Sequence, residues 1–337
     1  MNDTLRFGLV GAGYFGRHYV RLLQDMPGAA LRAIADRSRE TIEKRAPELP
    51  ASIARAAEAE DIFSNPEIDC VVIATPAQSH AGLAVRALEA GKHILVEKPM
   101  AMNLQEAEAM RRATEKSGKT LMVGHQYLYN DHIRHLKKKF DEGMLGAVQY
   151  VFAEHFSFGP VRPGIGCFAE MAVHELAIID YLFSPGDIAD VTGSIVDFFG
   201  TGRDDFASAS IRFANGLVAV VAVSWFAPEK VRRMTIAGAQ GMAVFDDRRE
   251  EKLKFFLHPY PVRDAISHAH ADGESASRFM EYAEGEIVMP AIDAREPLRN
   301  QLKHFISCVR KGAEPISGIT HGLRVTRMME VISRAIA

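Results

Sequence analysis

Residues 7–16 read Phe7-Gly-Leu-Val-Gly-Ala-Gly-Tyr-Phe-Gly16, an apolar run that turns into a glycine loop before an amphipathic segment. This order predicts a strand, a phosphate-binding loop and a helix. Gly11 permits a tight turn, Gly13 lets a pyrophosphate approach the backbone, and Gly16 lets the helix pack closely on its strand. The free N–H groups of the first helical turn would face the phosphates. The pattern predicts a dinucleotide site.

The acid that follows the second apolar run bears on the choice of dinucleotide. Leu31 to Ala35 is apolar and ends in Asp36, about 20 residues after the last glycine of the loop. A carboxylate here accepts hydrogen bonds from the adenosine ribose and repels a 2′-phosphate, which favours NAD. Arg37 and the two residues after it would instead bind that phosphate if Asp36 turned aside, so NADP is the alternative.

Composition and cysteine usage set limits on the class of protein. The 337 residues are 47% hydrophobic and 25% charged with a net charge of −3, which argues against a disordered polymer and a strongly basic nucleic-acid binder. The length allows two domains with separate cores. Cys70, Cys167 and Cys308 are widely separated, and no signal peptide or long apolar span is evident. We expect buried thiols in a cytoplasmic protein with no membrane partner.

The first 120 or so residues alternate apolar runs with helical periodicity, which is typical of a parallel sheet with crossover helices. Ligands of such sheets bind outside the carboxyl ends of the strands. Residues of the cofactor crevice should therefore lie at the carboxyl ends of the strands, namely Thr75, Pro76, Glu97 and Lys98. The expected strands are 70–76, 93–99 and 121–125, and the expected helices are 79–90 and one that begins at Asn103, with Glu106 completing its cap.

The pattern changes after Gly124. Short turns such as Ala214-Asn-Gly216 join consecutive strands and predict antiparallel pairing. The expected elements are a helix near 132–142, strands at 148–154, 190–198, 208–213, 218–224 and 232–237, and two helical stretches over 297–337; the polar segment 259–286 gives no prediction. We predict an α/β protein with a doubly wound parallel sheet over 1–124, followed over 125–337 by an α+β domain with a largely antiparallel open sheet.

Several short motifs together resemble the Gfo/Idh/MocA oxidoreductases over nearly the whole chain. They are the glycine loop, Ala74-Thr-Pro76 with His80 four residues later, the segment 91–99 ending in Glu97-Lys-Pro99, Gly124-His-Gln126, Gly143-Met-Leu-Gly146, Glu296-Pro-Leu-Arg299 and His321-Gly-Leu-Arg324. The resemblance implies a Rossmann domain and a mixed-sheet domain that forms a homodimer or homotetramer. It also implies hydride transfer between a nicotinamide and a sugar or cyclitol hydroxyl carbon, with cofactor contacts that include Tyr14, Phe15, His80, Glu97 and Gln126.

Oxidation of a secondary alcohol needs a group that removes the hydroxyl proton. The candidates are Lys98 and His174. Glu170-Met-Ala-Val-His174 resembles the acid-x-Gly/Ala-x-His signature of the family, although relatives usually carry aspartate at the first position. Residues four apart share a helix face, so Glu170 is expected to orient the imidazole. The alternative is a core histidine. No third ligand at convincing spacing accompanies the two, so no metal site is predicted.

The substrate class is suggested by further likenesses. The run 172–182, with the acid Glu175 directly after His174, is similar to the nucleotide-sugar branch that includes UDP-N-acetylglucosamine 3-dehydrogenases, as are 124–130 and the loop 158–162. Arg162 would suit a diphosphate, or is an ordinary surface arginine. We expect a nucleotide-activated amino sugar, such as a UDP-N-acetylhexosamine that reacts at C3. The alternatives are a free sugar or cyclitol as substrate, and a dinucleotide-binding regulator without turnover.

Overall fold

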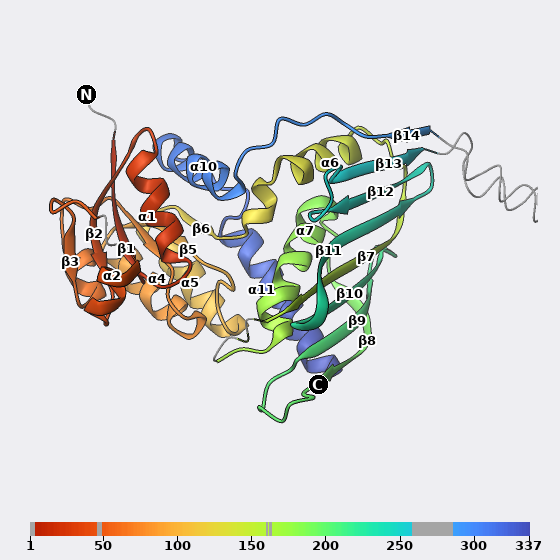
Figure 1. The fold of residues 1–337 in the computed structure, drawn as a ribbon, viewed down its shortest axis with the longest axis horizontal. Helices are drawn as coiled ribbons and strands as arrows, with labels where there is room; N and C mark the ends of the chain where they lie inside the picture. The colour runs from red at the N-terminus through yellow and green to blue at the C-terminus, as the bar shows by residue number, and fades with distance from the viewer. Residues whose placement is uncertain (1–3, 46–48, 160, 162–163, 258–285) are drawn as a thin grey trace, which may run out of the picture. The chain divides into compact units, whose positions relative to one another are not determined.

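The computed structural model describes residues 4–45, 49–159, 161, 164–257 and 286–337 (Figure 1). The chain divides into two compact units, Met1–Tyr129 with Glu296–Glu330 and Asn130–Arg295 with Val331–Ala337. The first boundary lies close to Gly124, where the sequence pattern changes. The segment Glu296–Glu330, however, groups with the first unit and not with the residues that precede it in the chain.

The first unit is built on a six-stranded sheet in the order β3-β2-β1-β4-β5-β6, with every neighbouring pair parallel. The order of the strands reverses between β1 and β4, and such a switch point is where doubly wound sheets bind ligands. The predicted Rossmann sheet is confirmed. The strands are β1 (Leu5–Val10), β2 (Ala29–Ala35), β3 (Ala54–Ala56), β4 (Cys70–Ile73), β5 (His93–Val96) and β6 (Leu121–Val123).

Helices follow the strands as the periodicity predicts. At the start of α5 the Asn103 side chain accepts a 2.9 Å hydrogen bond from the N–H of Glu106, and its amide donates to the Glu106 carboxylate at 3.2 Å, which confirms the predicted cap. The helices are α1 (Gly16–Asp25), α2 (Arg39–Arg45), α3 (Ala59–Phe63), η1 (Ala77–Ser79), α4 (His80–Glu89), α5 (Leu104–Ser117), η2 (Gln126–Tyr129), α10 (Pro297–Lys311) and α11 (Ile319–Ile336).

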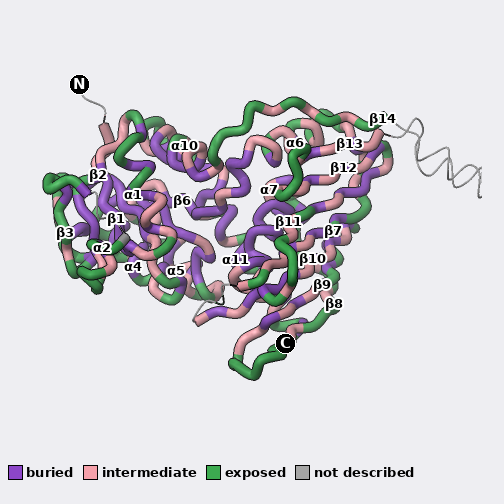
Figure 2. Tube along the Cα trace, viewed as in Figure 1, coloured by how far each residue is buried: buried purple, intermediate pink, exposed green. Residues whose placement is uncertain are grey.

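The helix α10 explains why the end of the chain belongs to the first unit. Phe305 is fully buried and meets the ring of Phe7 on β1 edge to face, with ring centroids 6.1 Å apart. Gln301 is also fully buried and donates a 3.1 Å hydrogen bond to the hydroxyl of Tyr19 on α1. The apolar stripe of α10 therefore completes the core around β1 and α1. Figure 2 shows that β1 is largely buried.

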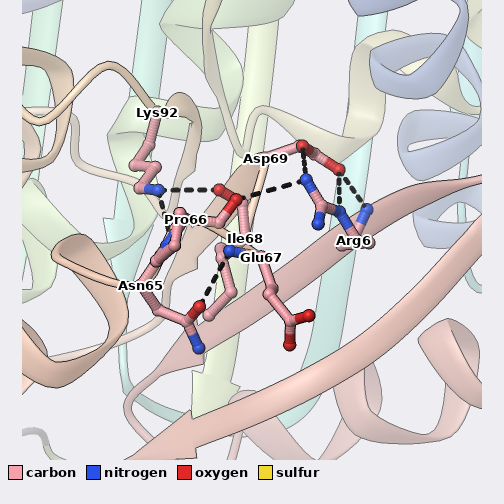
Figure 3. A network of polar contacts seen from close by, with 7 residues as sticks. All are labelled: Arg6, Asn65, Pro66, Glu67, Ile68, Asp69 and Lys92. Carbon is pink, nitrogen blue, oxygen red and sulfur yellow. Dashed lines mark hydrogen bonds and ion pairs between the residues drawn. The ribbon is translucent and has the colours of Figure 1, made fainter.

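A polar network fastens the amino ends of the strands (Figure 3). The Arg6 guanidinium donates to both oxygens of Asp69, at 2.9 Å and 2.7 Å. The Lys92 ammonium, whose residue is only 6% exposed, donates to the carbonyls of Asn65 and Ile68 at 2.6 Å and 2.8 Å. Burial lowers the pKa of Lys92. These bonds hold the segment before β4 at the edge of the sheet opposite to the glycine loop.

The second unit contains an eight-stranded sheet in the order β14-β13-β12-β11-β7-β10-β9-β8. Its pairs are antiparallel except for β7 and β10, which run parallel. The largely antiparallel sheet is thus confirmed. The strands are β7 (Val148–Phe158), β8 (Ile188–Val196), β9 (Phe206–Phe213), β10 (Val218–Ser224), β11 (Phe226–Gly238), β12 (Gly241–Asp246), β13 (Leu253–Leu257) and β14 (Glu286–Val288).

One face of this sheet packs on helices and the other is exposed. The helices α6 (Asp131–Asp141) and α7 (Val173–Phe183) lie against one face (Figure 1), and a π-helical turn, η3 (Phe168–Ala172), leads into α7. Along β7, Val151 and Ala153 are buried, whereas the alternate residues Tyr150 and Phe152 are 44% and 38% exposed. This alternation marks a sheet with one covered face.

The three cysteines, Cys70, Cys167 and Cys308, are buried and form no disulfide, as expected. Burial raises the pKa of each thiol. Among the helices in the described ranges, none combines the length and the apolar character needed to cross a membrane.

Candidate active site

The glycine loop has the backbone geometry that the sequence predicts. Gly11 adopts a φ of +95°, and a Cβ there would lie 2.5 Å from the carbonyl oxygen of Ala74. A Cβ on Gly16 would lie 2.1 Å from the carbonyl oxygen of Gly11, so only glycine allows α1 to start this close to the loop. A Cβ on Gly13 would meet nothing within 4 Å. Gly13 therefore faces open space through which a phosphate can approach the backbone.

The carboxylate of Asp36 is fixed beside this loop. One oxygen accepts a 2.8 Å hydrogen bond from the N–H of Ala12, and the other accepts one of 2.9 Å from the N–H of Ser38. Each oxygen retains a lone pair for a ribose hydroxyl. Because two backbone donors hold it, the carboxylate does not turn aside in the way that binding of a 2′-phosphate would require.

A cavity of about 780 Å³ opens at this edge of the sheet, and its volume falls in the range of small-molecule sites. The exposed side chain of Arg37 lies at its wall. Residues predicted for the cofactor contribute much of the lining, namely Gly11, Gly13, Asp36, Arg37, Thr75 and Pro76. The open space at Gly13 and the held carboxylate of Asp36 both fit a dinucleotide.

Two loop residues predicted for the cofactor, Tyr14 and Phe15, lie between Gly13 and the start of α1. Tyr14 is 53% exposed, and the guanidinium of Arg17 stacks over its ring at 4.5 Å. Phe15 packs edge to face on the buried ring of Tyr19, with centroids 5.9 Å apart. Gln126 begins η2 directly after β6 and is half-buried. Their contacts with a cofactor stay a prediction.

His80 has a different position from the other residues assigned to the cofactor. It is 1% exposed and does not line the cavity, and its two ring nitrogens lie 2.8 Å from the Pro99 carbonyl oxygen and 2.9 Å from that of Thr75. Burial lowers its pKa. Both nitrogens are thus directed at the backbone of the chain.

Lys98 follows β5 by two residues, and Thr75 follows the adjacent strand β4 by two. The paired residues Ile73 and Val96 bring these strand ends side by side, so the backbone of Lys98 lies next to the wall of the cavity. The Lys98 side chain is half-buried, and the peptide bond between Lys98 and Pro99 is cis. Thr75 and Pro76 line the cavity, whereas Glu97 and Lys98 are not among its lining residues, so the gathering of all four along the cofactor crevice stays a prediction.

Glu97 is buried behind Lys98. One carboxylate oxygen accepts a 2.7 Å hydrogen bond from the Tyr19 hydroxyl, and the other accepts a 3.2 Å bond from the backbone N–H of Lys98. A Cβ on Gly124 would lie 3.0 Å from this carboxylate, which accounts for the glycine there. Burial and the charge of Glu97 raise the pKa of Tyr19 well above its usual value, so it remains a donor.

The second pair of predicted catalytic residues lies in the other unit. Glu170 is half-buried in the π-helical turn η3, and His174 is 9% exposed in the first turn of α7. The sequence pattern predicts a continuous α-helix, whereas the π-helical turn is wider. Such turns occur frequently at functional sites. The predicted orientation of His174 by Glu170 stays a prediction. Arg162 lies outside the described residues.

A buried polar cluster adjoins His174. The ring of His155 on β7 lies 5.9 Å from that of His174, and its Nδ1 is 3.1 Å from Oε1 of Glu175, although the angle is not that of a hydrogen bond. Arg232 on β11 donates to Nε2 of His155. Because a guanidinium only donates, this nitrogen carries the lone pair and the proton is on Nδ1. Burial lowers the pKa of Arg232 to about 10.

Sequence reasoning missed His155 and Arg232. A signal did exist for His155, since it continues the inward-facing alternation of Val151 and Ala153, and a histidine at such a position needs polar partners. No comparable signal exists for Arg232, which reaches His155 through the pairing of β11 with β7.

Comparison with known proteins shows two family matches. Residues 5–125 match the oxidoreductase family model with an NAD-binding Rossmann fold, Gfo/Idh/MocA, and residues 133–244 match the Gfo/Idh/MocA C-terminal domain.

Individual relatives act on several kinds of substrate. The chain is 32% identical over 235 residues to the 1-carboxy-3-chloro-3,4-dihydroxycyclohexa-1,5-diene dehydrogenase of Comamonas testosteroni, covering 66% of this chain but only 58% of that protein. It is 26% identical to the inositol 2-dehydrogenase of Rhizobium meliloti, and the match covers 99% of this chain and 97% of that protein. Its fold is similar to that of the UDP-N-acetylglucosamine 3-dehydrogenase GnnA of Acidithiobacillus ferrooxidans, with a TM-score of 0.80 and 23% sequence identity. The match covers 99% of this chain and 98% of that structure's chain.

Proposed function

Because the chain belongs to the Gfo/Idh/MocA family of NAD-binding oxidoreductases, we propose that it transfers a hydride between NAD and a sugar. The reaction interconverts a secondary hydroxyl group of the sugar and the corresponding ketone. The observation that carries the proposal is the position of Lys98, whose backbone is fixed at a strand end beside the wall of the dinucleotide cavity. A group that transfers the hydroxyl proton belongs at that place.

Bound NAD supplies the hydride acceptor, and the residues of the chain supply binding and proton transfer. The glycine loop and Asp36 hold the dinucleotide through backbone N–H groups and a ribose-binding carboxylate. The uncharged amine of Lys98 removes the proton from the substrate hydroxyl. His174 is the second proton-transfer group, and Glu170 orients the imidazole. In the reverse direction the protonated amine returns the proton to the ketone oxygen.

We propose a nucleotide-activated amino sugar as the substrate, such as a UDP-N-acetylhexosamine that is oxidised at C3. Support comes from the sequence of η3 and α7, in which the acid Glu175 directly follows His174, and from the shared fold with GnnA. The second candidate is a cyclitol or free sugar, which is favoured by the nearly full-length match to an inositol 2-dehydrogenase. The third candidate is a dinucleotide-binding regulator that has no catalytic turnover.

A substrate panel separates these candidates. NADH formation is followed with UDP-N-acetylglucosamine, UDP-N-acetylgalactosamine, dTDP-glucose, myo-inositol, scyllo-inositol and free hexoses, for the wild type and for Lys98→Ala and Lys98→Arg. We expect turnover with a UDP-amino sugar, and a loss of roughly 10²-fold or more in Lys98→Ala while NADH binding remains. Turnover only with inositols selects the second candidate. Normal turnover in Lys98→Ala removes Lys98 from the mechanism.

We also propose that the exposed face of the second unit's sheet contacts a second copy of the chain. Tyr150 and Phe152 are exposed side by side on the outward face of β7, and exposed apolar surface of this kind marks interfaces. Light scattering should give a dimer or tetramer for the wild type and smaller species for Phe152→Glu. A monomeric wild type contradicts the proposal.

A further inference from the structure

We propose that His80 is a positioning residue that ties the strand end bearing Lys98 to the strand end bearing Thr75. This proposal rests on the proposed role of Lys98. His80 opens α4, immediately behind the cavity wall formed by Thr75, Pro76 and Ser79. Its two ring nitrogens lie at hydrogen-bond distance from carbonyl groups of two different strand ends, 2.8 Å for Pro99 and 2.9 Å for Thr75, and the neutral ring donates its one N–H to one of them.

The two contacts differ in what they join. The contact with Thr75 is local, because five residues separate the partners in the chain. The contact with Pro99 spans 19 residues and is the one that reaches across to the next strand end. Pro99 directly follows Lys98, so the ring fixes the backbone on the carboxyl side of Lys98. Glu97 fixes it on the amino side through the 3.2 Å bond to the Lys98 N–H.

The burial of His80 restricts it to this role. It is 1% exposed, and both of its nitrogens face carbonyl oxygens and not the cavity. A direct contact between this ring and a cofactor would break one of the two contacts. His80 therefore acts on the site through the backbone that it holds, and not as a cofactor ligand.

The consequence for the reaction is geometric. A proton-transfer group works only within hydrogen-bond reach of the substrate oxygen, and a displacement of about 1 Å costs on the order of 10²-fold in rate. The side chain of Lys98 has many rotamers, so its reach is determined by a rigid backbone at its root. A hydrogen bond from the His80 ring to the Pro99 carbonyl contributes to that rigidity on the carboxyl side of Lys98.

The first test uses the protein without cofactor or substrate. His80→Phe keeps a ring of similar size and removes both nitrogens, and His80→Gln restores one donor. His93→Asn is the control, because His93 lies at the opposite end of β5 and asparagine keeps an acceptor for the N–H of Thr120. Hydrogen exchange of the amides from Glu97 to Met102 should be about 10-fold faster in His80→Phe, partly restored in His80→Gln and unchanged in His93→Asn. Unchanged exchange in His80→Phe overturns the proposal.

The second test measures catalysis. His80→Phe should lower kcat roughly 10-fold or more while the NADH dissociation constant changes less than about 3-fold, and His80→Phe/Lys98→Ala should be no slower than Lys98→Ala. Additive losses, or weakened NADH binding at normal kcat, overturn the positioning role. Full activity of Lys98→Ala alone contradicts the proposed function instead, and the exchange result then still decides whether His80 holds this segment.

Discussion

The hydroxyl of Tyr19, on the first helix of the chain, donates a 2.7 Å hydrogen bond to Oε1 of Glu97, the residue before Lys98. Both residues are buried, and Gln301 of α10 donates to the same hydroxyl at 3.1 Å. A buried carboxylate is stable only when it is paired or hydrogen-bonded. The three residues come from widely separated parts of the sequence, so the support of Lys98 depends on the assembled first unit.

Tyr19→Phe should therefore destabilise the protein. The change removes a donor from a buried carboxylate, which costs about 1–3 kcal/mol in the free energy of unfolding. Urea unfolding monitored by circular dichroism measures the difference. Tyr14→Phe is the matched control, since Tyr14 is 53% exposed and should change the stability little. Equal stability of both variants would show that the Tyr19 hydroxyl does not support Glu97.

Asp36→Ala should narrow the preference for NAD over NADP. The carboxylate that repels a 2′-phosphate is lost, and Arg37 at the cavity wall remains to attract it. Paired measurements of kcat/KM with the two cofactors give the ratio. Glu58→Ala, at the same cavity wall, is a control for the loss of a negative charge. An unchanged ratio in Asp36→Ala would exclude Asp36 as the discriminating residue.

His174→Ala and Glu170→Gln should each lower turnover, and the double variant should be little slower than His174→Ala alone. Two groups that act as a unit can be disabled only once. If Glu170 lies against the imidazole, its neutralisation also moves the histidine-dependent limb of the pH profile downward, because an imidazolium loses a negative neighbour. If the losses of turnover are strictly additive and the pH profile is unshifted, Glu170 does not act through His174.

His93 should make the stability of the protein depend on pH between about 4 and 6.5. Its Nδ1 accepts a 3.1 Å hydrogen bond from the N–H of Thr120, and burial followed by the charge of Lys119 lowers its pKa to about 4. Above pH 6.5 the ring is neutral in the folded and the unfolded state, and His93 makes its full contribution to the free energy of unfolding. As the pH falls toward 4 the unfolded chain takes up the proton first, so stability is lost at no more than about 1.4 kcal/mol per pH unit.

The variant His93→Asn tests this dependence. Asparagine keeps an acceptor near Nδ1 but does not titrate, so its unfolding free energy should fall less steeply than that of the wild type between pH 6.5 and 4. Parallel curves for the wild type and His93→Asn would show that His93 titrates equally in the folded and unfolded states.

Local patterns were enough to predict much of the fold and of the cofactor site. The turn at Gly11 and the cap at Asn103 depend on neighbouring residues, and the structure has them as expected. The strands before Thr75 and Lys98 are also present and adjacent, but they end at Ile73 and Val96, three residues earlier than predicted. The same dependence on neighbouring residues explains why the role of His80 could be predicted only in part. Its motif indicated a place near the cofactor, but not that its nitrogens face the carbonyls of Thr75 and Pro99.

Features that depend on distant packing were not predictable. The parallel pairing of β7 with β10 and the contact of Arg232 with His155 depend on how strands far apart in the chain come together. The π-helical turn around Glu170 has a sequence that looks α-helical, because an inserted residue in a helix leaves the apolar pattern nearly intact. Short-range periodicity contains no information on any of these.

The return of α10 to the first unit has a consequence for synthesis on the ribosome. Chains grow from the amino terminus, and domains generally fold as units when their residues have emerged. Here the core around Phe7 lacks Phe305 until residues 130–295 of the second unit have been synthesised. The glycine loop therefore leaves the ribosome before the second unit, yet the cofactor-binding unit is completed only after most of the second unit. A nascent chain stalled before residue 297 should therefore hold NAD weakly, even though every residue lining the dinucleotide cavity is already present.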